Sequence, residues 1–183
     1  MNRKFSNVIL RGQRLFIRPM LESDAEFVVN SRNDPRVHKW LFKTNILTVE
    51  SHLKWFAKPK PDRMDFIICL NENNKAIGTL TYDKIDIKKN SAEIGKMLAP
   101  DYWSKGYMME ALPLWLAFGF ENLCLKSIYA QTLSSNYKNI KLNQKFGFKI
   151  EKIISDKYQR DDGFYDIISM VLTKKEAVKG NII

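Results

Sequence analysis

The segment Trp103-Ser104-Lys105-Gly106-Tyr107 combines residue types that suit anion binding. It lies between a stretch with strand character and a stretch with helical character. Successive backbone N–H groups in such a loop can converge on a phosphate, and a helix N-terminus adds about half a positive charge. Gly106 permits close approach of a ligand to the backbone, and Lys105 adds a point charge. An ordinary turn before a helix has the same appearance and is more common, so this segment does not decide the function alone.

Asn136 marks a second segment of interest because it follows an expected strand and opens an expected helix. The same helix is followed by Lys145-Phe146-Gly147-Phe148. An N-cap asparagine and a C-cap glycine at Gly147 explain both signals on one short helix. That explanation still leaves room for a ligand at the helix start.

The composition restricts the classes of protein to which the chain can belong. Its 183 residues fit one domain, residues 1–183, and a hydrophobic content of 45% fills one core. The net charge of +10 attracts polyanions. The positive residues are scattered and show no helix-turn-helix, zinc-finger or stacking-aromatic pattern. We therefore expect no nucleic acid partner, and a phosphate-bearing cofactor or an acidic substrate is favoured.

Short segments of the chain argue against membrane insertion, secretion and a metal site. The apolar stretch Ala111–Phe120 is interrupted by Pro113 and is too short for a bilayer, which needs about 20 residues. Met1–Phe5 has no apolar signal-peptide region, so we expect a cytoplasmic protein without membrane contact. Cys69 and Cys124 lie in separate apolar runs, which predicts two buried, reduced thiols and no metal.

The order of expected elements predicts a mixed α/β fold. Strands are expected at Val8–Pro19, Asp65–Leu70, Ala76–Tyr82, Ala92–Leu98, Ile128–Leu133, from Phe148, and at Tyr165–Leu172. Helices are expected from Ser23 or Asp24 to Val29, around Val37–Leu41, from Thr48 through Phe56, at Gly106–Asn122 and at Asn136–Lys145. Asp162-Gly163 predicts a turn, and the tail from Thr173 to Ile183 is expected to be loosely held. A strand joined through a helix to the next strand predicts a parallel pair.

Several short motifs occur together in the chain, and each is weak alone. They are Ala92-Glu93-Ile94-Gly95, Leu98-Ala99-Pro100, the loop at 103–107, Glu110-Ala111-Leu112, Asn136, Lys145-Phe146-Gly147-Phe148 and, at the two ends, Leu15-Phe16-Ile17-Arg18-Pro19 and Gly163-Phe164-Tyr165-Asp166. The combination resembles the GNAT acetyltransferase superfamily, in particular its RimJ/RimL-like branch. The resemblance implies an α/β GNAT (acyl-CoA N-acyltransferase) fold, with a mixed, mostly antiparallel sheet. That sheet would be splayed at a central parallel strand pair and flanked by helices.

The resemblance also implies acetyl-CoA as co-substrate. Its pantetheine arm would enter between the strands at Glu93–Leu98 and Ile128–Leu133, and its diphosphate would rest on the loop amides. The implied cofactor-binding residues are Met97, Leu98, Trp103, Ser104, Lys105, Gly106, Tyr107, Met108 and Asn136. Two positions depart from the family, which often has Gln or Arg at Trp103 and a small residue at Met108. Because backbone amides make the contact, such side-chain changes are tolerable.

For catalysis, the resemblance places a general base at Glu93, acting directly or through water. A solvated strand glutamate is an equal alternative from the sequence. A backbone N–H near Met97 or Leu98 would stabilise the oxyanion. Asn143 occupies the position of the family's thiolate-protonating tyrosine, and Asn139 that of a serine in RimL-like enzymes. Tyr137, Ser134 or water could protonate the thiolate instead, and expelling it unprotonated costs only about 2 kcal/mol at pH 7.

The acceptor amine is suggested by a second, shorter resemblance. Arg32–Val37, Leu41-Phe42 and Glu50–Phe56 resemble the PseH-type acetyltransferases of amino-sugar nucleotides. The implied substrate-binding residues are Arg32, Arg36, His52 and Trp55, with Lys39 as a further cation. A solvated helix face explains each charged residue singly, and Trp55 is also a plausible core residue. Protein N-terminal acetylation of the RimJ/RimL type and a non-catalytic acetyl-CoA-binding module are the alternatives, and monomer and homodimer both stay open.

Overall fold

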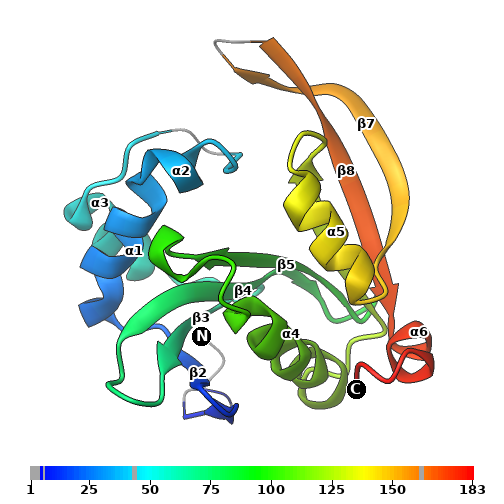
Figure 1. Ribbon diagram of the computed structural model, residues 1–183, viewed down its shortest axis with the longest axis horizontal. Helices are drawn as coiled ribbons and strands as arrows, with labels where there is room; N and C mark the ends of the chain where they lie inside the picture. The colour runs from blue at the N-terminus through cyan, green and yellow to red at the C-terminus, as the bar shows by residue number, and fades with distance from the viewer. Residues whose placement is uncertain (1–4, 6, 43–44, 161–162) are drawn as a thin grey trace. The chain divides into compact units, whose positions relative to one another are not determined.

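The computed structural model describes residues 5, 7–42, 45–160 and 163–183 (Figure 1). Among these residues the strands form one eight-stranded sheet in the order β1-β2-β3-β4-β5-β6-β8-β7. The strands are β1 (Leu10–Arg11), β2 (Leu15–Pro19), β3 (Met64–Leu70), β4 (Ala76–Asp86), β5 (Ser91–Leu98), β6 (Ser127–Leu133), β7 (Lys149–Arg160) and β8 (Gly163–Thr173). The helices are η2 (Glu22–Asp24), α1 (Ala25–Asn33), α2 (Pro35–His38), α3 (Val49–Phe56), η3 (Pro100–Tyr102), α4 (Tyr107–Ala117), η4 (Phe118–Asn122), α5 (Tyr137–Lys145) and α6 (Lys174–Lys179).

The pairing confirms a mixed sheet with a parallel pair at its centre. Strands β5 and β6 run parallel, with Ser91 opposite Ser127 and Glu93 opposite Tyr129. Strand β2 is antiparallel to both β1 and β3, β3 to β4, and β8 to both β6 and β7. The connection from β5 to β6 contains α4, as expected for a parallel crossover. The predicted α/β class, with a mostly antiparallel sheet and a central parallel pair, is therefore confirmed.

The chain divides into two compact units. Unit 1 comprises residues 1–83 and 95–115, and unit 2 comprises residues 84–94 and 116–183. Strands β4 and β5 contribute residues to both units. The expectation of one domain over residues 1–183 stays a prediction.

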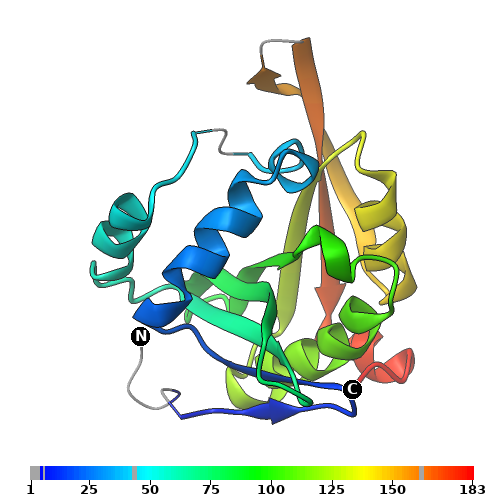
Figure 2. The ribbon, with the colours of Figure 1, turned by 60° about the vertical axis from the view of Figure 1, so that its left-hand side comes forward.

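The core of unit 1 lies on both faces of strand β3. Ile67 and Cys69 project toward one face, where they pack with Met20 and with Val28 of α1. Phe66 projects to the opposite face, because successive strand residues alternate. There it meets Trp115 of α4, whose ring centroid is 4.9 Å from that of Phe66. Helices α1 and α3 contact each other in this unit (Figure 2).

The core of unit 2 lies between helix α5 and the long hairpin of β7 and β8 (Figure 1). Asn143 of α5 is completely buried and its Nδ2 donates to Met170 Sδ of β8 at 3.6 Å. Phe146 and Phe148, on either side of Gly147, are also buried. Gly147 has a φ of +77° and lies one residue beyond the C-cap, Phe146. The glycine was therefore predicted at the right helix end but one position off.

The first predicted strand is divided in two. β1 and β2 form a hairpin in which Leu10 lies opposite Ile17, so the alternation of Val8–Pro19 belongs to both arms of a turn. The turn closes where Gly12 N–H donates to Leu15 O at 2.8 Å. Its outer carbonyls accept from Asn71 Nδ2, with the Gln13 oxygen at 2.9 Å. A tight turn within an alternating segment leaves the period-2 pattern unbroken, which is why the pattern did not reveal it.

The C-terminal end also differs from the expectation of a loosely held tail. Residues Lys174–Lys179 form helix α6, and the side chain of Ala177 is fully buried. Thr173 caps this helix reciprocally with Glu176, which also pairs with Lys149 of β7. These interactions lower the pKa of Glu176 to about 2, with the Lys149 contact the largest cause. The cap and the buried Ala177 side chain therefore hold residues Lys174–Lys179 in a helix, which the composition did not predict.

Smaller differences concern one thiol, one helix and one turn. Cys69 is buried as predicted, but Cys124 is exposed, so the expectation of two buried thiols is wrong for Cys124. The helix expected over Gly106–Asn122 is α4 up to Ala117, and its last turn, η4, is a π-helix. The predicted Asp162-Gly163 turn includes Asp162, which lies outside the described residues.

Candidate active site

The loop at residues 103–108 has the backbone conformation of an anion-binding site. Ser104 and Gly106 both have positive φ, +59° and +81°. Helix α4 begins at Tyr107, and Glu110 N–H donates to Gly106 O at 3.2 Å. The N–H groups of the first helical turn, from Tyr107 onward, therefore have no acceptor within the helix. Left-handed residues followed by a free helix start form a concave array of donors that suits a phosphate group.

Trp103 connects this loop to the end of β5. Its Nε1 donates to Leu98 O at 2.8 Å, while Ala99 N–H donates to Ile77 O of β4 at 2.9 Å. The Trp103 indole therefore tethers the loop to the end of β5, a role that its residue type did not predict. It also occupies one lone pair of the Leu98 carbonyl, a residue at which the resemblance implies a pantetheine contact.

Arg14 and Glu110 hold the loop in place through an ion pair and a hydrogen bond to Lys105 O. Neither residue was predicted from the sequence to belong to the site. Glu110 Oε1 accepts from Arg14 N at 2.7 Å, and Oε2 accepts from Arg14 Nε at 2.9 Å. Arg14 Nη1 donates to Lys105 O at 3.0 Å, and its guanidinium lies 4.7 Å from the centroid of the Tyr107 ring. Burial opposes ionisation of Glu110, but the hydrogen bonds from Arg14 outweigh it and lower the pKa of that carboxyl.

Gly12 shows how closely Glu110 approaches the β1–β2 turn. A Cβ at Gly12 would lie 2.6 Å from Glu110 Oε1 and 3.3 Å from Leu15 O. Any side chain at this position would therefore displace the carboxylate that holds Arg14. The pairing of β1 with β2, which no sequence signal disclosed, is what brings Arg14 to the loop.

Glu93, the predicted base, lies in unit 2 and forms an ion pair. Its Oε2 accepts from Lys84 Nζ at 2.8 Å, and 22% of the Glu93 side chain is exposed. The carboxylate is therefore accessible and held beside a cation. Asn136, in the same unit, caps α5 by accepting from Asn139 N–H at 3.2 Å through Oδ1. The cap does not need Nδ2 of Asn136.

Asn139 and Asn143 lie on α5 in different surroundings. Asn139 is partly buried near the helix start, whereas Asn143 is fully enclosed against Met170. Tyr137, one of the predicted alternatives for thiolate protonation, is 70% exposed. An asparagine amide does not ionise at neutral pH, so neither asparagine can serve as a general acid.

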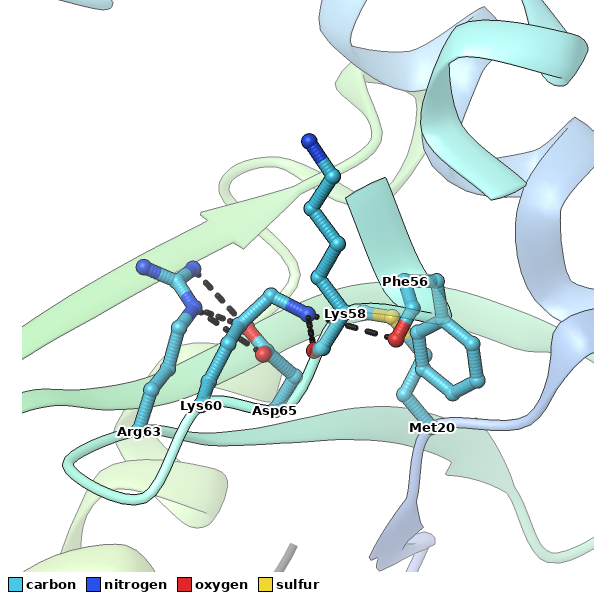
Figure 3. Close-up of a pocket in the computed structure, with 6 residues that line it drawn as sticks. All are labelled: Met20, Phe56, Lys58, Lys60, Arg63 and Asp65. Atoms are coloured by element: carbon cyan, nitrogen blue, oxygen red, sulfur yellow. Dashed lines mark hydrogen bonds and ion pairs between the residues drawn. The ribbon is translucent and has the colours of Figure 1, made fainter. Parts of the chain in front are cut away.

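A basic cluster surrounds a cavity of about 180 Å³ in unit 1 (Figure 3). Its lining comprises Met20, Phe56, Lys58, Lys60, Arg63 and Asp65. In Figure 3, Arg63 faces Asp65, with Nη2 2.8 Å from Oδ1, and Lys60 reaches back to the Lys58 carbonyl at 2.9 Å. Arg63 also pairs with Asp83 at 2.9 Å. Lys60 and Arg63 both lie over the Trp55 ring, at 4.1 and 5.1 Å from its centroid.

Three of the four predicted acceptor residues belong to this cluster. His52 is buried beside Trp55, with ring centroids 5.3 Å apart. Burial lowers the pKa of His52, and Arg32 and Lys60 lower it further against the opposing effect of Asp65. Burial, with the nearby Arg63, also lowers the pKa of Arg32. Arg32 Nε is buried and has no hydrogen-bond acceptor among the described residues.

Arg36, the fourth predicted acceptor residue, makes different contacts. Its Nη2 lies 2.7 Å from Asp34 Oδ2 and 3.7 Å from Asp101 Oδ1, and 59% of the side chain is exposed. The Asp34 contact belongs to the cap of α2, in which Arg36 N–H also donates to Asp34 Oδ1. Arg36 is thus committed to a local ion pair, and the structure instead adds Lys60 and Arg63 to the cluster.

The remaining expected absences concern metals and membranes. In the ranges that the structure describes, no three His, Cys, Asp or Glu side chains are grouped closely enough to hold a metal ion. None of the helices in the described part of the chain has the length and hydropathy needed to span a bilayer.

Comparisons with known proteins confirm the predicted GNAT fold. Residues 14–149 match the acetyltransferase (GNAT) domain family. The N-acetyltransferase p20 of Bacillus licheniformis, itself uncharacterised, is 28% identical over 91% of this chain and 97% of that protein. Acetyltransferase PseH of Campylobacter jejuni is 26% identical over 79% of this chain and 84% of that protein. The Vibrio cholerae spermidine N-acetyltransferase, solved with CoA and spermine, has a TM-score of 0.85 at 20% identity and covers 90% of this chain and 98% of its own.

The fold and the family match together define an acyltransferase. The chain belongs to the GNAT acetyltransferase family, and it uses acetyl-CoA as its co-substrate.

Proposed function

We propose that this enzyme transfers the acetyl group of acetyl-CoA to the primary amine of an acceptor that carries a negative charge, such as a nucleotide-linked amino sugar. The observation that carries this proposal is the basic cluster in unit 1. Among the described residues, four cationic side chains, those of Arg32, Lys58, Lys60 and Arg63, meet three carboxylates, those of Asp62, Asp65 and Asp83. The uncompensated charge attracts an anion such as a diphosphate.

The position of Arg32 strengthens this argument. A buried guanidinium nitrogen without an acceptor is costly, and a ligand oxygen would satisfy it. His52 beside it is held neutral by burial, so it can accept or donate a hydrogen bond without adding charge. The Trp55 ring packs against Lys60 and Arg63 and holds both cations at the same place. These features suit an acceptor with a negatively charged part.

The same charge argues against a polyamine acceptor. The Vibrio cholerae relative in fold acetylates spermidine, which is a polycation. A polycation entering a cluster with excess lysine and arginine would be repelled. A shared fold does not transfer a substrate, and here the local charge points to the opposite sign.

At the co-substrate end, we propose that the diphosphate of acetyl-CoA binds the amides of the loop at 103–108. Lys105 supplies a further positive charge, and 37% of the Trp103 side chain stays exposed at the loop start. The thioester carbonyl would accept from a backbone N–H near Met97 or Leu98 as its oxygen gains charge. Side chains contribute little to this binding, which explains why Trp103 and Met108 can depart from the common family pattern.

The chemical step follows from these assignments. Glu93 removes a proton from the ammonium group, and the neutral amine attacks the thioester carbonyl. The new N–C bond forms, the C–S bond breaks with its electron pair leaving on sulfur, and the nitrogen releases its second proton to water. Because Asn139 and Asn143 cannot supply a proton, we assign protonation of the thiolate to water or to the exposed Tyr137 hydroxyl. The weak basicity of a thiolate makes a strong acid unnecessary.

An Nα-acetyltransferase of the RimJ/RimL type is the second candidate, and the same cluster supports it. An acidic protein N-terminus would also find the excess positive charge favourable, whereas a basic one would be repelled. The nucleotide-linked acceptor is preferred because Arg32–Val37 and Glu50–Phe56 resemble the PseH-type acetyltransferases of amino-sugar nucleotides.

A thiol-release assay with three acceptor classes tests the proposal. Purified protein and acetyl-CoA are incubated with nucleotide-linked amino sugars, acidic peptides or polyamines. We expect the highest kcat/KM with the nucleotide-linked class, and a fall in that value with rising salt as charges are screened. Preferred turnover of polyamines would contradict the proposal. Tight acetyl-CoA binding without turnover of any class would identify a non-catalytic binding module.

A further inference from the structure

Arg14 stands out because its contacts converge on the loop although it lies about 90 residues away in the chain. It donates through its backbone N and its Nε to the two oxygens of Glu110. Through Nη1 it donates to the carbonyl of Lys105, and it covers the ring of Tyr107. One side chain thus fixes the two residues on either side of Gly106 and the first turn of the helix that follows.

We infer that Arg14 is a positioning residue for the acetyl-CoA co-substrate. With Glu110, it holds the loop at 103–108 in the conformation that directs its amides toward the diphosphate. This inference rests on the proposed role of that loop. Arg14 touches neither the amine nor the thioester, so it acts on binding of the nucleotide half of the co-substrate.

The geometry explains why such a support is needed. Ser104 has a φ of +59°, a conformation that L-residues adopt at a cost of about 1–2 kcal/mol. A loop containing this residue would relax unless outside contacts hold it. The Lys105 carbonyl, fixed by Arg14 Nη1, is the peptide oxygen directly before Gly106. Anchoring this carbonyl on the inner side orients the following N–H group of Gly106 away from the anchor.

The exposure of Arg14 suggests an additional electrostatic effect. Half of the Arg14 side chain, 50%, is exposed, and Nη2 lies 3.3 Å from the position of a Cβ on Gly106. The cation is therefore next to the point where the backbone is open for ligand approach. Glu110 offsets part of this charge, so the pair acts mainly by geometry and adds a modest attraction.

The test compares acetyl-CoA with acetyl-pantetheine, which has the same thioester but lacks the diphosphate. We expect Arg14→Ala to raise the KM for acetyl-CoA roughly tenfold to hundredfold, the range for losing hydrogen bonds to charged groups. The kcat/KM for acetyl-pantetheine should stay within about twofold of wild type, and kcat at saturating acetyl-CoA should change little. Arg11→Ala is the matched control, because it removes an exposed arginine of β1 outside the loop contacts.

Further variants separate positioning from a loss of folding. Glu110→Gln should also raise the KM for acetyl-CoA selectively, and its effect should not add to that of Arg14→Ala. If Arg14→Ala does not fold, Arg14→Lys is used, since a lysine keeps the charge but cannot bridge Glu110 and Lys105 together. Equal losses with both thioesters, or an Arg14 variant that behaves like Arg11→Ala, would overturn the inference.

The experiment also distinguishes this inference from the proposed function. If Gly106→Trp abolishes CoA binding while the Arg14 variants match the Arg11 control, the loop assignment stands and Arg14 is not its support. If Gly106→Trp leaves CoA binding intact, the loop does not bind the diphosphate, and the role of Arg14 is overturned with it.

Discussion

We propose that the loop at 103–108 and the basic cluster around Arg32, Lys60 and Arg63 both bind anions, but in different ways. At the loop, Arg14 and Glu110 form an ion pair that holds the backbone in place, and Lys105 adds one positive charge. The donors offered to a ligand are main-chain N–H groups. In the cluster, cations outnumber carboxylates, and Arg32 Nε is buried without an acceptor among the described residues.

This difference indicates that the loop determines specificity for the co-substrate and the cluster determines specificity for the acceptor. A site made of backbone donors depends on loop conformation and tolerates side-chain changes, which suits a co-substrate shared by a whole family. A site made of side-chain charges changes with single substitutions, which suits an acceptor that differs between relatives. We therefore expect substitutions in the two regions to change different kinetic constants.

The largest effect should come from Gly106→Trp. Gly106 has a φ of +81°, so any side chain strains the loop and covers its amides. The affinity for CoA, measured by calorimetry, should fall at least about a hundredfold. If the variant keeps some activity, its KM for the acceptor should equal that of the wild type, because the loop does not contact the acceptor. Gly163→Trp is the matched control, because Gly163 also has positive φ and nothing lies within 4 Å of its Cβ position. An equal loss of CoA affinity in both variants would show that the loop is not the binding site for the diphosphate.

Glu93→Gln should change the rate of the chemical step without changing the affinity for acetyl-CoA or for the acceptor. The kcat should fall roughly a hundredfold at low pH, where the acceptor amine is protonated and needs a base. At high pH the amine deprotonates in solution, so the deficit should shrink. The ratio of wild-type to variant kcat is measured across pH, with Lys84→Met to show the effect of removing the ion-pair partner alone. A ratio that is flat with pH would exclude Glu93 as the base.

Arg32→Met should raise the KM of an anionic acceptor about tenfold, which corresponds to roughly 1.4 kcal/mol of binding. The KM for acetyl-CoA should not change, because the loop contacts do not involve Arg32. Lys54→Met is the control, since Lys54 is an exposed lysine of α3 that pairs with Glu50. If Arg32→Met changed the acetyl-CoA constant instead, the division of labour between the two regions would be wrong.

The smallest effect concerns the stability of the cluster. Because burial lowers the pKa of His52, the unfolded state binds a proton that the folded state does not. The free energy of unfolding should therefore decrease as the pH falls below about 6.5, the value for an unfolded histidine. His52→Gln should reduce this slope in urea titrations at several pH values. An unchanged slope in His52→Gln would show that His52 is not held neutral.

Much of the fold was predictable because its signals are local. Thr48 caps α3 and Asn136 caps α5, as their residue types and positions predicted, and β5 to β6 forms the parallel crossover. Each of these features depends on neighbouring residues or on one chain connection. Gly12 and the Thr173–Glu176 capping box are also local signals, for the β1–β2 turn and for the start of α6, but neither was used. The pairing of Arg14 with Glu110 and of Glu176 with Lys149 joins distant segments and has no local signal.

The candidate site divides in the same way. Gly106 and Ser104 lie in a loop whose position between strand and helix is readable from the sequence. Arg32, His52 and Trp55, predicted as acceptor-binding residues, lie in one cluster, and their role in binding stays a prediction. Arg14 was missed because only the β1–β2 hairpin brings it to Glu110. Arg63 was missed because it follows two prolines in an irregular segment, and only its pairs with Asp65 and Asp83 reveal its place.

The most direct test of the central claim is calorimetric titration of the wild-type protein with CoA and with pantetheine, which lacks the diphosphate and the nucleotide. If the amides of residues 103–108 bind the diphosphate, CoA should bind with measurable heat and pantetheine at least about a hundredfold more weakly. Equal affinities for the two compounds, or no binding of CoA, would contradict the account.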